Sequence, residues 1–149
     1  MARVNVTKEI AAPPERVWAV LADPQRFEEW LTLHTKWKAE PPATVSKGTT
    51  MTEVVTIMGM ANTITWNVQD YDAPNTLTIS GTGMAGAKVT FTPAVQGGAG
   101  TSVASIGAEF ISQMMVGAIG AIGAIGGAVE RASVKELNAS LDNVAALIV

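Results

Sequence analysis

The C-terminal stretch from residue 111 to residue 149 constrains the fold more than any other part of the chain. Between Val116 and Ala128, glycine recurs at three-residue spacing. Beyond it, apolar residues follow at three- and four-residue steps, which is the spacing of one stripe on an α-helix. We therefore predict one long C-terminal helix from near Val116 to near Leu147, on the order of 45 Å in length. The stripe consists of Val134, Leu137, Leu141, Val144 and Ile148.

The glycines of this helix are costly. Each interior glycine weakens a helix by about 1 kcal/mol relative to alanine, and Gly120, Gly123, Gly126 and Gly127 all lie inside it. Close approach of a sheet, or space for a bound molecule, would offset that cost. Gly120 and Gly123 share one helix face, so we expect this face to border a cavity. Replacing Gly123 with leucine should then lower either ligand affinity or the melting temperature.

A membrane span is the alternative interpretation of the same region. Residues 110–129 carry no charge, and twenty such residues are long enough to cross a bilayer. However, the run is mostly glycine and alanine, Ser112 and Gln113 lie inside it, and no Lys/Arg cluster flanks it. The strands predicted upstream also need a helix to cover them. We therefore favour the covering helix.

Composition sets broad limits on the class of protein. The chain has 149 residues, of which 48% are hydrophobic and 15% charged, so we expect a single folded domain over residues 1–149. The net charge is −3 and no basic patch is visible, which argues against nucleic-acid binding. Cysteine is absent, which excludes disulfides and cysteine-ligated metals. The N-terminus lacks an apolar signal region, so we expect a cytoplasmic protein.

The rest of the chain alternates between strand and turn signals. Residues 3–11 predict a strand by period-two alternation. Pro13 and Pro14 open a short helix, and Asp23 can cap a second one that ends near Leu31. Short turns join the later strands, so neighbours should be antiparallel. The predicted class is α+β: a curved antiparallel sheet of six or seven strands wrapped around the long helix, with two short helices after the first strand. The later strands are expected at 49–58, 61–71, 77–82, 87–95 and 101–111.

Three segments of the chain resemble a known superfamily. Residues 12–18 (Ala-Pro-Pro-Glu-Arg-Val-Trp), residues 21–24 and Trp30 are similar to the helix-grip fold of the START-like or SRPBCC superfamily, also called the polyketide cyclase/dehydrase and lipid-transport superfamily. The resemblance extends over essentially the whole chain. Residues 29–37, 47–49 and 59–66 resemble a bacterial subgroup that includes toxins of toxin–antitoxin pairs. The resemblance implies a cavity between sheet and long helix without implying a given chemistry.

Three side chains are candidates for acid–base chemistry. His34 is the only histidine, and imidazole changes charge near neutral pH; packing between Trp30 and Trp37 is its alternative role. Glu53 and Glu109 would face the cavity if their strands place them on the concave side, where a carboxyl removed from water holds its proton more readily. The opposite register would leave either carboxyl in water. No catalytic triad and no set of residues at metal-ligand spacing is found, so we expect neither a metal nor a cofactor.

The expected ligand site combines the concave strand positions with the start of the long helix. Trp66, at the centre of a strand, is the best candidate for the cavity wall, whereas Trp18 and Trp30 are expected to anchor the short helices. The predicted ligand-binding residues are Met51, Glu53, Val55, Ile64, Trp66, Val68, Ile79, Phe91, Glu109, Met115, Ile119, Gly120 and Gly123.

Three functions are compatible with these residues. The first is binding of a hydrophobic or amphipathic small molecule, such as a lipid or a polyketide-like compound, without catalysis. The second is a cyclase or aromatase-like enzyme that uses His34, Glu53 or Glu109, which requires at least two of these groups in one pocket. The third, implied by the subgroup resemblance alone, is a toxin that an antitoxin-like protein neutralises. The residues leave binding and catalysis open.

Overall fold

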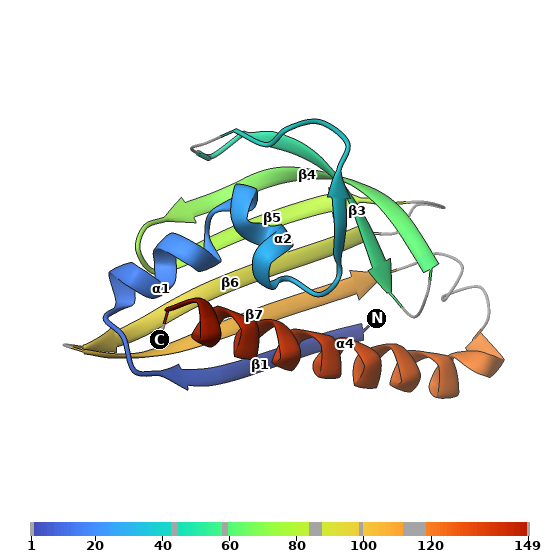
Figure 1. Ribbon diagram of the computed structural model, residues 1–149. Coiled ribbons are helices and arrows are strands. Elements are labelled where there is room, and N and C mark those ends of the chain that lie inside the picture. Colours follow the sequence, from blue (N-terminus) through green and yellow to red (C-terminus); the bar gives the residue numbers. More distant parts are fainter. Residues whose placement is uncertain are drawn as a thin grey trace.

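The computed structural model describes residues 2–42, 45–57, 60–83, 88–98, 100–111 and 119–148 (Figure 1). At residues 2, 57, 60, 110–111 and 119–130 it describes the backbone alone. The predicted site residue Met115 lies outside this part of the chain. The environments of Ile119, Gly120 and Gly123 lie outside it as well, so the predicted effect of leucine at position 123 stays a prediction.

Seven antiparallel strands form one curled sheet in the order β1-β7-β6-β5-β4-β3-β2 (Figure 1). The chain crosses from one edge to the other once, after β1, and then returns through the sheet strand by strand. This confirms the predicted α+β class and the antiparallel pairing. The strands are β1 (Ala2–Ile10), β2 (His34–Trp37), β3 (Thr50–Ile57), β4 (Met60–Asp72), β5 (Thr76–Thr82), β6 (Lys88–Gly98) and β7 (Thr101–Ile111).

Two short helices follow β1, as predicted. Helix α1 (Pro14–Leu21) starts at a proline, where the missing N–H has no helical partner to lose. A 3-10 turn, η1 (Pro24–Arg26), leads into α2 (Phe27–Trp30), and Asp23 Oδ1 caps it by accepting from the Gln25 amide at 3.0 Å. Arg26 pairs with Glu29 beside this turn, and that hydrogen bond lowers the pKa of the Glu29 carboxyl below its ordinary value. The turn thereby presents Phe27 and Trp30 to the core.

The long helix α4 (Ile119–Ile148) lies along β1 and packs on α1 and α2 (Figure 1). Four residues of the predicted stripe, Leu137, Leu141, Val144 and Ile148, are buried. The fifth, Val134, is 36% exposed. None of the described helices is long and apolar enough to cross a membrane.

Hydrogen bonds tie α4 to the segment between α2 and β2. Ser140 Oγ accepts from the Thr32 amide at 3.0 Å, and Thr32 Oγ1 donates to the Glu136 carbonyl oxygen at 3.0 Å. Nearby, Asn143 Nδ2 donates to the Trp30 carbonyl oxygen at 3.2 Å. Because Ser140 and Leu137 are buried, the middle of α4 and residues 30–33 form one packed unit.

Candidate functional site

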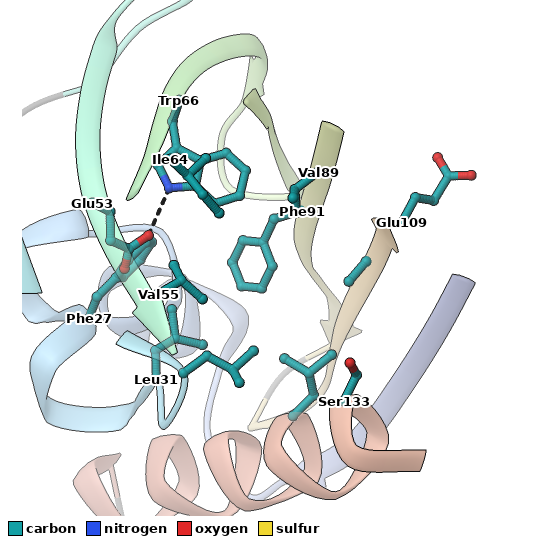
Figure 2. Close-up of a pocket in the computed structure, with 13 residues that line it drawn as sticks. Phe27, Leu31, Glu53, Val55, Ile64, Trp66, Val89, Phe91, Glu109 and Ser133 are labelled. Carbon is teal, nitrogen blue, oxygen red and sulfur yellow. Dashed lines mark hydrogen bonds between the residues drawn. The ribbon is translucent and has the colours of Figure 1, made fainter. Parts of the chain in front are cut away.

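A small apolar cavity lies between the concave face of the sheet and α4 (Figure 2). Its volume is about 60 Å³. One wall comes from the sheet, and the opposite side comes from α2, the segment after it, and α4. The described lining residues are Phe27, Leu31, Leu33, Glu53, Val55, Ile64, Trp66, Val89, Phe91, Ala108, Glu109, Ser133 and Leu137.

Strand alternation selects which side chains reach this cavity. In β3, Met51, Glu53 and Val55 are buried on the concave side, and in β4, Ile64, Trp66 and Val68 are buried likewise. Glu53 lies directly opposite Ile64, and Met51 opposite Trp66. The register therefore places the Trp66 indole diagonally across from the Glu53 carboxylate, within hydrogen-bonding reach.

Glu53 is the centre of a buried polar cluster. Its side chain is 1% exposed. Trp66 Nε1–H donates to Oε1 at 2.7 Å, and Figure 2 shows this bond. His34 Nδ1 is hydrogen-bonded to Oε2, and the His34 side chain is 3% exposed. Since a buried carboxylate is costly without partners, these two contacts explain how an acid is held in an apolar core.

The edge strand β2 brings His34 to Glu53. A bulge between His34 and Lys36 shifts the register, so that His34 pairs with Val55 and Trp37 pairs with Glu53. The Trp37 ring packs 5.3 Å from the His34 ring, and its Nε1–H donates to the Pro24 carbonyl oxygen at 3.0 Å. The aromatic ring and the carboxylate together fix the orientation of the imidazole.

Glu109 does not join this cluster. Ala104, Ile106 and Ala108 of β7 face the core, so Glu109 belongs to the opposite set of side chains. Its carboxylate accepts from Arg3 Nε at 2.7 Å on the neighbouring strand. Figure 2 shows the side chain turned away from the cavity. Glu109 therefore borders the space, but its carboxylate does not face it. The concave orientation considered for Glu109 is thus corrected.

The remaining predicted residues divide into two groups. Val55, Ile64, Trp66 and Phe91 line the cavity together with Glu53. Met51, Val68 and Ile79 are buried in the core next to it but do not border the space. Sequence reasoning placed all seven on the inner face, and only side-chain packing distinguishes wall from core.

The lining contains residues that the sequence analysis did not name. Phe27, Leu31 and Leu33 come from α2 and the segment that follows it. Leu137 and Ser133 come from α4, four residues apart on one helix face, and Leu137 was part of the predicted stripe. The sequence could therefore have identified two of these residues. Leu137 belongs to the predicted helical stripe, and Val89 lies two positions from Phe91 on the same face of a predicted strand. Among the described residues, no three His, Asp or Glu side chains lie close enough to hold a metal ion.

A curled antiparallel sheet that holds a C-terminal helix over an apolar cavity defines a helix-grip protein of the START-like class. The sequence identifies the family within that class. The chain belongs to the polyketide cyclase / dehydrase and lipid transport family, whose sequence model matches residues 1–149.

Relatives and solved structures agree with this assignment. "Toxin Rv0910" of Mycobacterium tuberculosis is 36% identical over 89 residues, which span 60% of this chain and 62% of that protein. The Zhui aromatase/cyclase of Streptomyces sp. R1128 superposes with a TM-score of 0.70 at 22% identity, over 95% of this chain and 92% of that one. The protein TTHA0849 of Thermus thermophilus superposes with a TM-score of 0.74 at 14% identity, over 97% of this chain and 98% of that one. At such identities the two structures show the fold alone.

Proposed function

We propose that the protein binds a small hydrophobic molecule, or the apolar part of a larger one, in the cavity between sheet and α4. The observation that carries the proposal is the cavity itself, whose described lining is apolar except for a few groups. Apolar walls with a few polar groups are typical of small-molecule sites. The family, which by its description includes lipid transport, agrees with binding as the role.

The size of the cavity limits what enters without rearrangement. Ligand pockets usually measure about 300–1,000 Å³, whereas this one measures about 60 Å³. A single aromatic ring or a short alkyl group is the appropriate first probe. Larger ligands require the lining to rearrange.

A cavity-filling variant tests the proposal. Ala108 lines the cavity, so Ala108→Leu places an isobutyl group in the space and should weaken toluene binding about tenfold or more. Ala61→Leu, at an exposed position of β4, is the matched control and should leave binding unchanged. Binding is measured by NMR titration of the tryptophan indole N–H signals. Equal toluene affinity in the two variants would place the ligand elsewhere.

Acid–base catalysis of a cyclase or aromatase type is a second candidate. It is favoured by the contact between His34 and Glu53, with Glu53 bordering the cavity. The test is incubation with linear β-ketone thioesters and detection of water loss by mass spectrometry. Activity that disappears in Glu53→Gln, with toluene binding retained, would establish catalysis. Binding without turnover of any such thioester would favour the first candidate.

A toxin role is a third candidate, and the relative named Toxin Rv0910 supports it. An inhibitor of growth should act in the cell that produces it and should be neutralised by a partner encoded nearby. Induced expression in a bacterial host, with and without the adjacent gene, tests this. Normal growth on expression, together with no complex on co-purification, would rule the role out.

A further inference from the structure

Among the described lining residues, Glu53 is the only charged one whose side chain enters the cavity. The other acid on its rim, Glu109, turns outward to Arg3 (Figure 2). Of the remaining described lining residues, Ser133 carries a hydroxyl and the Trp66 indole N–H is already bonded to Glu53. A ligand in this space therefore meets one carboxylate in an apolar wall.

This carboxylate retains capacity to accept hydrogen bonds. Two carboxylate oxygens offer about four acceptor positions. Trp66 Nε1–H occupies one position on Oε1, and His34 Nδ1 contacts Oε2. These two contacts leave acceptor positions on both oxygens unused, and a hydrogen bond to an ionised acceptor is stronger than one between neutral groups.

The charge of the site determines which ligand head group fits. A carboxylate or phosphate on the ligand would bring a like charge and more acceptors toward Glu53, which is unfavourable in an apolar environment. His34 is the one titratable side chain in contact with Glu53 among the described residues, and it does not border the cavity. A neutral donor also avoids burying a second charge.

We propose that the ligand is a neutral apolar molecule with a hydroxyl group that donates to Glu53, such as a phenol or an alcohol, and that fatty-acid anions are excluded. This inference rests on the proposed binding function of the same cavity. It goes beyond that function because it specifies the head group and the residue that selects it.

Three probes of similar size test the inference in the intact protein: phenol, toluene and benzoate. We expect phenol to bind about tenfold more tightly than toluene, because it gains one hydrogen bond to a charged acceptor. We expect benzoate to bind most weakly of the three. Because the hydroxyl shares the carboxylate with His34, phenol should shift the His34 ring signals in NMR spectra and toluene should not. This comparison needs no variant.

Two glutamate variants then locate the selectivity. Glu53→Gln should reduce the phenol-to-toluene affinity ratio toward one, whereas Glu109→Gln, at the outward-facing acid, should leave it unchanged. If Glu53→Gln does not fold, the wild-type ratio and the His34 signals decide. Equal affinity for phenol and toluene, or tightest binding of benzoate, would overturn the inference and leave the binding cavity standing. No binding of any probe would overturn the proposed function as well.

Discussion

Gly81 lies where a side chain would press on two residues of the cavity wall. It pairs directly with Trp66 across β4 and β5. A Cβ atom at this position would lie 2.5 Å from Ile64 Cγ2, 2.8 Å from the Thr65 carbonyl oxygen and 3.0 Å from Trp66 Cε3. The backbone oxygen cannot move aside as a side chain can, so the shape of the wall depends on the absence of a side chain here.

Gly81→Ala is therefore expected to destabilise the protein by about 1–3 kcal/mol, the usual cost of overpacking. Gly107→Ala is the matched control. Its Cβ atom would meet nothing closer than 3.7 Å, and alanine in a strand interior should be neutral or stabilising by about 0.5–1 kcal/mol. Urea denaturation measures both. Equal stability of the two variants would show that the residues around position 81 can move to accommodate a methyl group.

At this scale the sequence left the faces of Glu53 and Glu109 open, and the structure turns Glu53 inward and Glu109 outward. Glu53 lies on the same strand face as Met51 and Val55, and these two apolar residues turn that face toward the core. Strand β7 offers no such contrast, because Val103 is exposed on one face while Ala104 and Ile106 are buried on the other. A one-residue difference in register reverses the face, and small residues on both sides do not decide it. The partner of Glu53, His34, depends on a strand that the sequence did not reveal.

A side chain of helix α1 contacts the C-terminal end of α4. Arg16 of α1 donates through a terminal nitrogen to the Ile148 carbonyl oxygen at 3.0 Å. The last carbonyl groups of a helix lack intrahelical partners and carry partial negative charge, so a guanidinium is favourable there. This contact connects α1 to α4 across 132 positions of the sequence.

Replacing Arg16 with methionine keeps much of the aliphatic stem and removes the donor. We expect a loss of about 0.5–1.5 kcal/mol in unfolding free energy and faster amide exchange in the last turn of α4. Arg131→Met, at an exposed position of the same helix, serves as the control and should change neither quantity. Unchanged exchange near Ile148 in the Arg16 variant would mean that packing alone holds the helix end.

Elements with strong periodicity were predicted closely, and a short edge strand was missed. The helix predicted from 116 to 147 is described from Ile119 to Ile148, and the strand predicted over 101–111 has those bounds. In contrast, β2 has four residues, His34–Trp37, with no alternation of buried and exposed positions. Its pairing with β3 through a bulge creates the strand, and no local pattern in the sequence reports such a long-range contact.

For the whole molecule, we expect entry of a ligand to require an opening motion, because the lining leaves only about 60 Å³ between the sheet and α4. The segment 31–33 contributes Leu31 and Leu33 to the lining, and Thr32 between them bonds to α4. The contact therefore joins two sides of the cavity. We expect this contact to hold in both the free and the ligand-bound protein and to break when the two sides separate.

Thr32→Val removes the hydroxyl, and with it the contacts to the Glu136 carbonyl oxygen and to Ser140 Oγ. It keeps the shape of the side chain and the hydrogen bond from the Thr32 amide to Ser140 Oγ. Because the closed free and closed bound states lose the same interaction, opening becomes easier while affinity stays constant. One hydrogen bond is worth about 1 kcal/mol, so association and dissociation rates should both rise about fivefold. Stopped-flow tryptophan fluorescence with phenol measures both rates. Thr35→Val, which breaks the 2.6 Å contact between Thr35 Oγ1 and Thr56 Oγ1 away from α4, should change neither rate. A change in affinity without a change in rates would mean that ligands enter by another route.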